Sequence, residues 1–217
     1  MGDASGSNPD RSTLKMKNRK IKAVIFDLGD TLIKQKVSFY KRLKRSYDIK
    51  VELDLFRKVF SKLFHTKSWE DTNNVMKKLA KICKLENNPS FLKYLEHLFI
   101  NQKYFYVKFS GTERLLKELN NNDYKTAMIT NWNQGCMDVI EHHNLKDYFY
   151  HIAISAYEGI KKPDPKLFRR VLRRLKVKPS EALMVGDSHD HDYFVAKRLG
   201  MHALLLERKE KKHSHSI

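Results

Sequence analysis

Cysteine, proline and glycine are all scarce in this chain of 217 residues, with two, five and eight copies respectively. The two cysteines, Cys83 and Cys136, lie far apart in segments with helical patterns, which excludes a disulfide framework and predicts unreactive thiols in a reducing cytoplasm. Apolar runs are short, and none approaches the roughly 20 residues that a membrane-spanning helix needs. We therefore expect a cytoplasmic protein without disulfides and without a membrane partner.

The two ends of the chain have compositions typical of unstructured segments. Residues 1–19 lack the apolar stretch of a signal peptide and are expected to form a disordered leader. Residues 208–217 are expected to form a basic tail, in which His213 and His215 are better explained as solvated side chains than as metal ligands. Between these segments, a hydrophobic share of 41% predicts a chain that buries a core.

Basic residues outnumber acidic residues, with 43 Lys and Arg against 25 Asp and Glu, which gives a net charge of +18. Such a charge attracts anionic partners over long distances, and these include nucleic acid, anionic lipid and phosphorylated substrates. The basic residues are spread along the chain and are not gathered in a nucleic-acid motif. A lysine-rich bias is therefore favoured over nucleic-acid binding, and the oligomeric state stays open.

The first half of the chain begins with a strand and continues with helices. Ile21–Phe26 is rich in β-branched residues and predicts a buried strand, and Asp27–Thr31 after it predicts a polar turn. Apolar residues between positions 34 and 109 recur at helical spacing and predict four helices without an intervening strand. Helix breaks are expected near residues 48–50, 66–68 and 87–89. The aromatic run 104–106 is interpreted as packing where the chain returns to the core.

From residue 110 onward, strand and helix patterns alternate. The predicted strands are 126–129, 151–154, 182–185 and 203–206, and the predicted helices are 112–120, 136–143, 165–175 and 193–199. Such alternation predicts a parallel sheet with helices on both faces. The expected fold is α/β, with a Rossmann-like core of five or six parallel strands (residues 20–33 and 110–207) and an inserted helical cap subdomain (residues 34–109).

Polar clusters directly follow several of the predicted strands: Asp27–Thr31, Thr130-Asn131, Lys161-Lys162-Pro163, and Gly186-Asp187 with Asp192. Parallel strands bring their carboxyl ends to one edge of the sheet, where ligands bind in open α/β folds. Carboxylates provide the hard oxygen ligands that Mg²⁺ prefers, and a lysine neutralises phosphate charge. The clusters therefore predict a site at which a carboxylate attacks a metal-bound phosphate.

The segments FDLGDTL, MITN, GIKKPDPKLF and VGDSHDHD, in this order, resemble the four signature motifs of the haloacid dehalogenase-like hydrolase superfamily. The resemblance implies that Asp27 is a nucleophile that forms an aspartyl-phosphate. It implies that Thr130, within the Thr130-Asn131 cluster of the substrate site, binds the transferring phosphoryl group. Lys162, ahead of the Pro163-Asp164-Pro165 run, would hold nucleophile and phosphate together.

The same resemblance assigns a Mg²⁺ site. Asp27 and Asp187 would ligate the ion together with the backbone carbonyl of Gly29, and Asp192 would orient metal-bound water or Lys162. Asp190 competes with Asp192 for this last role, and the spacing favours Asp192. His189 and His191, which alternate with these aspartates, are interpreted as surface loop residues and not as a transition-metal site.

The chain departs from the family pattern at Gly29. In phosphatases of the family, an aspartate at this position acts as general acid and then as general base, a contribution of ~10² to 10⁴ in rate. Asp30 is one residue too late to replace it. The prediction is a Mg²⁺-dependent phosphatase of small phosphorylated metabolites with good leaving groups. The alternatives are a weakly active homologue that acts as a binding or regulatory protein, and a metal-independent dehalogenase.

Overall fold

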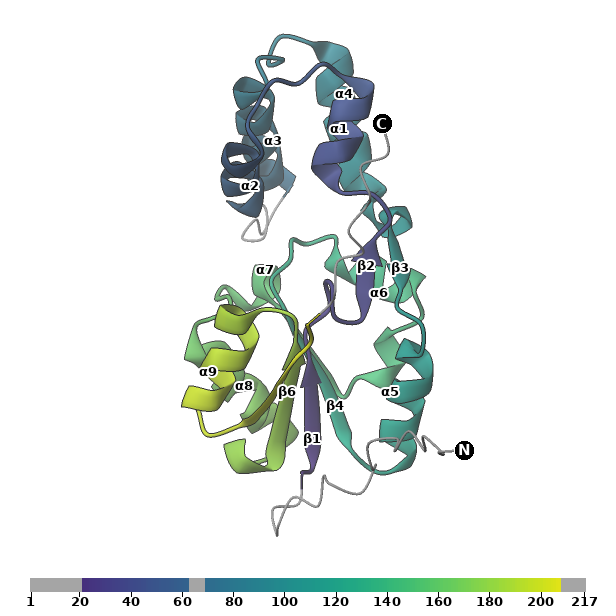
Figure 1. Ribbon diagram of the computed structural model, residues 1–217, viewed down its shortest axis with the longest axis vertical. Coiled ribbons are helices and arrows are strands. Elements are labelled where there is room, and N and C mark those ends of the chain that lie inside the picture. Colours follow the sequence, from purple (N-terminus) through teal and green to yellow (C-terminus); the bar gives the residue numbers. More distant parts are fainter. Residues whose placement is uncertain (1–20, 63–68, 208–217) are drawn as a thin grey trace, which may run out of the picture.

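A computed structural model describes residues 21–62 and 69–207 of the protein (Figure 1). The expected leader 1–19, the expected tail 208–217 and the expected helix break at 66–68 lie outside the described residues. Over the described ranges, no helix is long and apolar enough to cross a membrane.

A five-stranded parallel sheet forms the centre of the fold, in the order β5-β4-β1-β6-β7 (Figure 1). Its strands are β1 (Ala23–Phe26), β4 (Lys125–Thr130), β5 (His151–Ile154), β6 (Ala182–Gly186) and β7 (His202–Leu205). The first strand lies in the middle, paired in parallel with β4 on one side and β6 on the other. The predicted Rossmann-like α/β core is confirmed.

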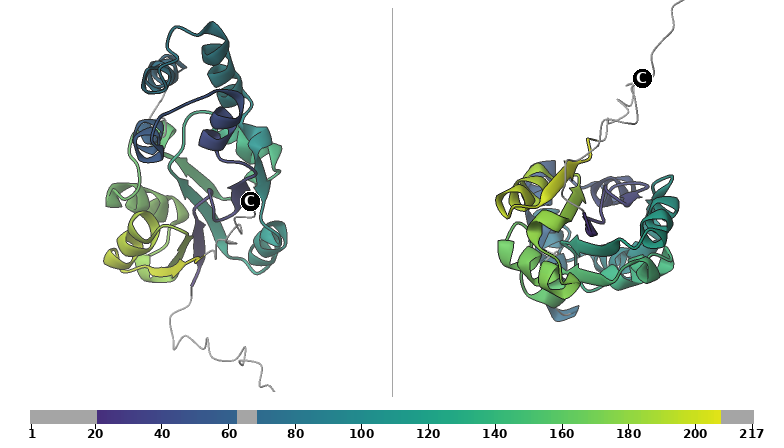
Figure 2. Two further views of the ribbon diagram at one scale, coloured as in Figure 1. Left: turned by 45° about the horizontal axis from the view of Figure 1, so that its top comes forward. Right: turned by 90° about the horizontal axis from the view of Figure 1, so that it is seen from below.

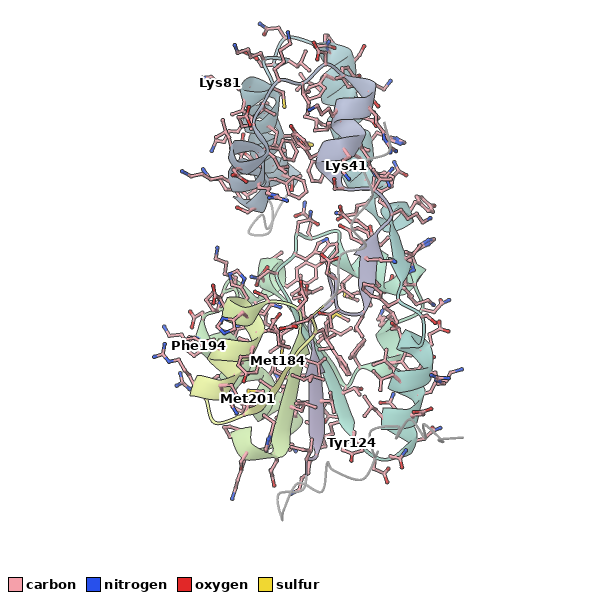
Figure 3. All side chains as sticks on the ribbon, viewed as in Figure 1. Lys41, Lys81, Tyr124, Met184, Phe194 and Met201 are labelled. Atoms are coloured by element: carbon pink, nitrogen blue, oxygen red, sulfur yellow. The ribbon has the colours of Figure 1, made fainter. Side chains whose placement is uncertain are left out.

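Alternate side chains of the central strand enter two different cores because successive residues of a strand point to opposite faces. Ala23 and Ile25 pack with α8 and α9, whereas Val24 and Phe26 pack with α5 and α6. The helices are α5 (Thr112–Asn121), α6 (Cys136–His142), α7 (Ser155–Glu158), α8 (Pro165–Leu175) and α9 (Phe194–Arg198). Figure 2 shows helices on both sides of the sheet. In Figure 3, Met184 and Met201 lie within the α8 and α9 side, and both are buried.

Four helices between β1 and α5 form a separate lobe, called the insert below, beyond the carboxyl edge of the sheet (Figure 1). They are α1 (Phe39–Ser46), α2 (Leu53–Phe60), α3 (Trp69–Ile82) and α4 (Pro89–Ile100), followed by a 3₁₀ turn, η2 (Gln102–Phe105). Asn88 caps α4 by accepting a hydrogen bond from the Phe91 amide at 3.0 Å, and Pro89 suits the first turn. Apolar side chains from all four helices form the insert's own core.

The predicted four helices follow one another with no strand between them over the described residues, but two short strands that were not predicted flank them. Strands β2 (Ile33–Gln35) and β3 (Tyr106–Lys108) pair antiparallel and join the insert to the core (Figure 1). Each strand has only three residues, too few for an alternating pattern to be recognised in a sequence. Their pairing is set by contacts between positions about 70 residues apart, which no local pattern reports.

The segment after β6 also differs from its prediction. Residues 189–193 form a π-helical turn, η5 (His189–Tyr193), and α9 begins only at Phe194. The wider turn places the side chain of Asp192 inside the protein, at 1% exposure. Ser188 supports the turn because its hydroxyl accepts a hydrogen bond from the amide of His191 at 3.2 Å. The short helix α7 was not predicted either.

Both cysteines are free and buried, as predicted. Cys83 follows α3 in the core of the insert, and Cys136 begins α6. Burial raises the pKa of Cys83 to about 11, and burial followed by the nearby Asp27 charge raises the pKa of Cys136 as well. The reactive thiolate form is therefore disfavoured at both positions.

Candidate active site

The polar side chains at the carboxyl edge of the sheet come from its three central strands. Asp27 directly follows β1, Thr130 is the last residue of β4, and Asp187 directly follows β6. The amide of Asp27 donates a hydrogen bond to the carbonyl of Val185 at 2.9 Å, so the pairing of β1 with β6 continues up to Asp27. Parallel pairing thus brings together residues that are far apart in the sequence.

Lys162 binds two carboxylates in the interior of the protein. Its Nζ atom lies 2.6 Å from Oδ1 of Asp27 and 2.6 Å from Oδ1 of Asp192. The three residues are 7% exposed or less. Burial of charge is costly unless the charges pair at short distance, and Lys162 provides that pairing for both carboxylates.

The loop that carries Lys162 is fixed by Asn131. The Nδ2 atom of Asn131 donates to the carbonyl of Lys162 at 2.9 Å, and the amide of Lys162 donates to Oδ1 of Asn131 at 2.8 Å. This reciprocal pair connects the end of β4 to the Lys162 loop. Side-chain amides that satisfy a loop backbone in this way hold the loop in one position. Asn131 therefore orients the Lys162 loop. The substrate-binding role predicted for Asn131 stays a prediction.

Asp192 reaches the site because the end of β6 is a glycine. A Cβ atom on Gly186 would lie 2.3 Å from Oδ2 of Asp192, closer than any real contact. The same Oδ2 atom accepts a hydrogen bond from the amide of Ser188 at 3.2 Å. Both carboxylate oxygens of Asp192 are therefore engaged, one by Lys162 and one by the backbone.

Charges in the site perturb each other. Burial acts to lower the pKa of Lys162, but the charges of Asp27 and Asp192 outweigh it, so the net pKa is raised and the ammonium is retained. Burial, followed by the charges of Asp27 and Asp30, raises the pKa of Asp187. The upward shift of Asp187 has the sign expected where carboxylates crowd together with too little positive charge.

The donor set fits a divalent cation with hard oxygen ligands. Ligand oxygens of Asp27, Asp187 and Asp192 lie within 4.8 Å of one another. Lys162 contacts Oδ1 of Asp27, and the carboxylate also interacts with the backbone of Leu28. Three carboxylates against one ammonium leave an excess of two negative charges, which matches the charge of Mg²⁺. Since both oxygens of Asp192 are engaged, Asp27 and Asp187 are the better ligands.

A cavity of about 470 Å³ lies above these residues, within the range of ~300–1,000 Å³ that is typical of small-molecule sites. Every residue that the sequence assigned to the site lines it: Asp27, Gly29, Thr130, Asn131, Lys162, Asp187 and Asp192. Asp190 is exposed and pairs with His189, outside the cavity lining. The structure thus brings the candidate residues to one cavity, while their chemical roles remain predictions.

Comparison with known proteins decides the family. Residues 24–206 match the haloacid dehalogenase-like hydrolases over nearly the whole described chain. The chain belongs to this family. It is therefore a haloacid dehalogenase-like hydrolase, in which Lys162, Asp27 and Asp192 form a buried cluster at the carboxyl edge of the central sheet.

Relatives of this hydrolase include proteins named as phosphatases. A glyceraldehyde 3-phosphate phosphatase from Pyrococcus furiosus is 31% identical over 190 residues, which cover 84% of this chain and 79% of the relative. Haloacid dehalogenase-like hydrolase domain-containing protein 3 from Mus musculus is 34% identical over 100 residues, covering 46% of this chain and 40% of the relative.

Solved structures share the fold of this hydrolase. A HAD phosphatase from Thermococcus onnurineus has a TM-score of 0.58 at 23% identity and covers 90% of each chain. A magnesium complex of a HAD family enzyme from Bacteroides thetaiotaomicron has a TM-score of 0.65 at 18% identity, covering 89% of this chain and 96% of the other. At these identities the likeness concerns the fold alone.

Several cavity residues of the hydrolase were not assigned to the site from the sequence. Gln35, Ser61, Tyr106, Trp132, Ser188 and His191 line the cavity together with the predicted residues. Tyr106 was interpreted as packing, and it does pack on Trp132 with ring centroids 5.0 Å apart. The signal missed was its position: Tyr106 lies on β3, directly opposite Gln35 on β2, where the chain returns from the insert.

Proposed function

We propose that this hydrolase is a Mg²⁺-dependent phosphatase that acts on a small phosphorylated metabolite through an aspartyl-phosphate on Asp27. The observation that carries the proposal is the buried contact of Lys162 with Asp27 and Asp192, each at 2.6 Å, beside the carboxylate of Asp187. A haloacid dehalogenase-like hydrolase needs a nucleophilic carboxylate close to a fixed cation, and this arrangement supplies both.

The protein groups divide the work of phosphoryl transfer. Oδ2 of Asp27 forms a bond to phosphorus while the ester bond breaks, and the electron pair of that bond goes to the leaving oxygen. Lys162 holds Oδ1 of Asp27 and neutralises charge between the carboxylate and the dianionic phosphoryl group. Thr130, which is buried at the end of β4 and lines the cavity, would hydrogen-bond a phosphoryl oxygen. Water then attacks phosphorus and the bond from phosphorus to Oδ2 of Asp27 breaks, so that its electron pair restores the carboxylate and phosphate is released. The proton that the water loses and the proton that the leaving oxygen gains are exchanged with solvent.

Asp27, Asp187 and the carbonyl of Gly29 would hold the ion. When bound, Mg²⁺ supplies positive charge that lets a phosphate approach the carboxylates and that stabilises charge on its oxygens. The excess of two negative charges among Asp27, Lys162, Asp187 and Asp192 supports such an ion. Asp192 acts through Lys162, because its two oxygens are engaged by Lys162 and by the amide of Ser188.

The substrate is expected to have a good leaving group. No carboxylate stands at Gly29 to protonate the leaving oxygen, a loss of ~10² to 10⁴ in rate for poor leaving groups. The names of relatives, among them the glyceraldehyde 3-phosphate phosphatase of Pyrococcus furiosus, support a small phosphorylated carbon compound as the substrate class.

The insert, within residues 34–109, is proposed to act as a cap over the core formed by residues 20–33 and 110–207, with a basic tail at 208–217.

The decisive experiment is a panel of phosphate esters assayed by phosphate release with Mg²⁺ and with excess EDTA. We expect hydrolysis of p-nitrophenyl phosphate with Mg²⁺ and its loss with EDTA. The Asp27→Asn protein should be inactive, and the Asp190→Asn protein, which changes an exposed acid on η5, should retain activity. Activity that survives in Asp27→Asn would contradict the proposed nucleophile.

Two other functions remain as outcomes of the same panel. A metal-independent dehalogenase would release halide from a 2-haloacid in EDTA, a reaction that needs no acid at Gly29. The crowding of Asp27 and Asp187 speaks against it, because a halide displacement has no use for a cation site. A weakly active binding protein would hydrolyse no ester and would bind nucleic acid with a steep dependence on salt.

A further inference from the structure

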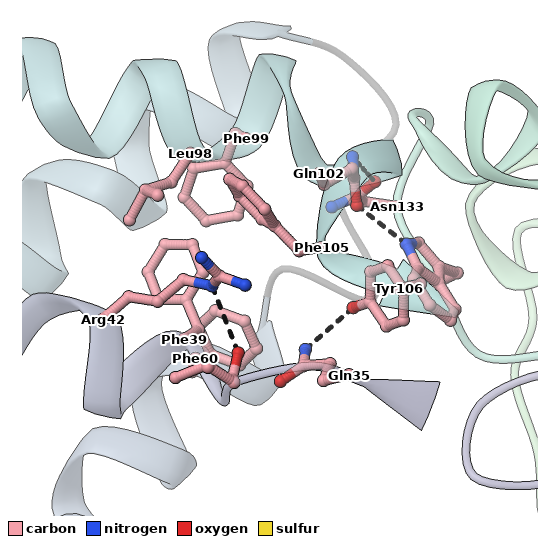
Figure 4. Close-up of a pocket in the computed structure, with 12 residues that line it drawn as sticks. Gln35, Phe39, Arg42, Phe60, Leu98, Phe99, Gln102, Phe105, Tyr106 and Asn133 are labelled. Atoms are coloured by element: carbon pink, nitrogen blue, oxygen red, sulfur yellow. Dashed lines mark hydrogen bonds between the residues drawn. The ribbon is translucent and has the colours of Figure 1, made fainter. Parts of the chain in front are cut away.

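Two neutral side chains stand where the catalytic cavity meets the insert. Gln35 and Tyr106 face each other across the β2–β3 ribbon, and Nε2 of Gln35 donates a hydrogen bond to the hydroxyl of Tyr106 at 2.8 Å. Figure 4 shows this pair at one end of a smaller recess whose other walls come largely from the insert. Gln35, Tyr106 and Trp132 line both the recess and the cavity that contains Asp27.

Gly29 and Trp132 lie between Asp27, the proposed nucleophile, and the pair formed by Gln35 and Tyr106. A Cβ atom on Gly29, two residues after Asp27, would meet Cζ3 of Trp132 at 3.6 Å. The ring of Trp132 packs on the ring of Tyr106, and its Nε1 atom donates to Gln102 at 3.0 Å, which fixes the indole. A phosphate ester whose phosphorus lies beside Asp27 therefore has Trp132 along its leaving group and Tyr106 farther on, toward the insert.

The pair has hydrogen-bonding capacity left over. Among the described residues, the side chains of Gln35 and Tyr106 hydrogen-bond to each other through a single contact. In that contact the phenolic oxygen accepts, so its hydrogen is available to a second partner, as is the carbonyl oxygen of Gln35. Burial raises the pKa of Tyr106, so the phenol stays protonated and acts as a donor. One donor and one acceptor side by side match a hydroxyl or carbonyl oxygen of a ligand.

The shared wall carries no charge. The guanidinium of Arg42, which also lines the recess, lies 4.0 Å from the centre of the Phe105 ring, and its Nε donates to the carbonyl of Val37 at 3.2 Å. Its charge is the smallest of the influences on the pKa of Tyr106. An ester with a second anionic group would thus meet neutral partners at Gln35 and Tyr106. An uncharged oxygen is the better match, since a neutral donor and acceptor can both pair with it, whereas a buried charge that meets only neutral partners is left poorly compensated.

We infer that Gln35 and Tyr106 form a specificity site that hydrogen-bonds an uncharged hydroxyl or carbonyl oxygen on the leaving group. This inference rests on the proposed phosphatase function and names its substrate class: small hydroxylated or carbonyl-bearing phosphate monoesters, in preference to plain alkyl esters of the same length. Neither residue takes part in bond breaking. Their contribution depends on whether the leaving group carries an oxygen within reach.

The test compares kcat/KM for glycerol 3-phosphate and propyl phosphate, two esters of equal carbon number of which one carries hydroxyls. The wild-type protein should prefer glycerol 3-phosphate by at least tenfold. In Tyr106→Phe and in Gln35→Met, the preference should fall about tenfold through loss of the glycerol ester, with propyl phosphate changing less than twofold. Tyr104→Phe is the matched control, because it removes an exposed phenol that lies outside the cavity lining.

Each remaining outcome decides one question. Equal losses on both esters in Tyr106→Phe and Gln35→Met would mean that the pair only clamps the ribbon, and this would overturn the inference. Hydrolysis by the wild type without a preference would overturn it as well, while leaving the phosphatase function intact. If the wild type hydrolyses p-nitrophenyl phosphate with Mg²⁺ but not glycerol 3-phosphate, the specificity site is overturned while the phosphatase function stands. If it hydrolyses none of the three esters, the proposed function fails and the specificity site fails with it.

Discussion

Lys162 is the residue on which the electrostatics of the site depend. It is 3% exposed and binds both Asp27 and Asp192 at 2.6 Å, so it compensates two buried carboxylates at once. Removing one partner from a buried ionic group is far more damaging than the pair's net contribution suggests, because the remaining charges lose their compensation. The single ammonium therefore links the stability of the core to the proposed chemistry.

Lys162→Met should lower the free energy of unfolding by about 3–5 kcal/mol and activity by about 10²–10³-fold. Burial already raises the pKa of Asp27 in the folded protein, and loss of the Lys162 ammonium, which acts to lower it, raises it further above its unfolded value. Such a group weakens the fold as pH rises through its folded pKa. The deficit, measured by urea unfolding, should be smaller near pH 5 than near pH 8. Lys161→Met, at an exposed neighbour, is the control; a pH-independent deficit would refute this account.

The glycine at position 29 removes a possible proton donor, and it is not required there by lack of space. A Cβ atom at this position would meet Trp132 at 3.6 Å, an ordinary contact, so the backbone here tolerates a Cβ atom without displacing the indole. Gly29→Asp should raise kcat for propyl phosphate by at least tenfold, because it restores a proton donor for a poor leaving group. Turnover of p-nitrophenyl phosphate, whose leaving group needs little protonation, should change far less. Equal changes on both esters would argue that leaving-group protonation does not limit the rate.

At the scale of elements, the turn after β6 is where local structure and the site are most tightly coupled. Gly186 ends the strand, and η5 then directs Asp192 back over it toward Lys162. The carboxylate of Asp192 fills the space that a Cβ atom on residue 186 would need, and its nearest oxygen would lie only 2.3 Å from that atom. A methyl group on residue 186 is therefore incompatible with the observed position of Asp192.

Gly186→Ala should therefore displace Asp192 from Lys162. We expect a loss of about 1–3 kcal/mol of stability from overpacking and at least a tenfold loss of phosphatase activity. Gly29→Ala serves as the matched glycine substitution, with a stability change of about 0.5 kcal/mol or less, because its methyl group meets only an ordinary contact. Thermal unfolding of the two variants measures the difference. Comparable stability of both would mean that η5 adapts easily, contrary to this account.

The core elements could be predicted because their signals are local. The buried run before Asp27, the proline at the start of α8 and the alternation of strands and helices each lie within a few residues of the sequence. Gln35 and Tyr106 could not be predicted in this way, since they are 71 positions apart and meet only through the ribbon. Asp192 could be chosen over Asp190 by spacing, but the π-helical turn that buries it has no sequence signature. Asp27, Thr130 and Asp187 could thus be proposed because they end or directly follow a strand, whereas Lys162 and Asp192 do not and were assigned through the resemblance to the family motifs.

At the scale of the whole molecule, the charge of the chain and the charge of the site have opposite signs. The chain carries +18, which draws phosphorylated anions toward the protein. The cavity, in contrast, is lined by four aspartates and two lysines: Asp27, Asp30, Asp187, Asp192, Lys161 and Lys162. A dianionic ester is attracted at long range and repelled at the last step. A bound cation resolves this conflict, which makes cation binding the property of the whole protein most worth measuring.

Mg²⁺ should raise the melting temperature, because an ion that binds only the folded chain stabilises it by RT ln(1 + [Mg²⁺]/Kd). At about 100 times Kd this is ~2.7 kcal/mol, or about 5–10 °C for a chain of this size. Asp187→Asn, which removes one of the two proposed carboxylate ligands, should abolish most of the shift, whereas Asp190→Asn should preserve it. Scanning calorimetry at several Mg²⁺ concentrations, without substrate, measures this independently of catalysis. An undiminished shift in Asp187→Asn would locate the cation elsewhere and remove the basis for a metal-assisted reaction at Asp27.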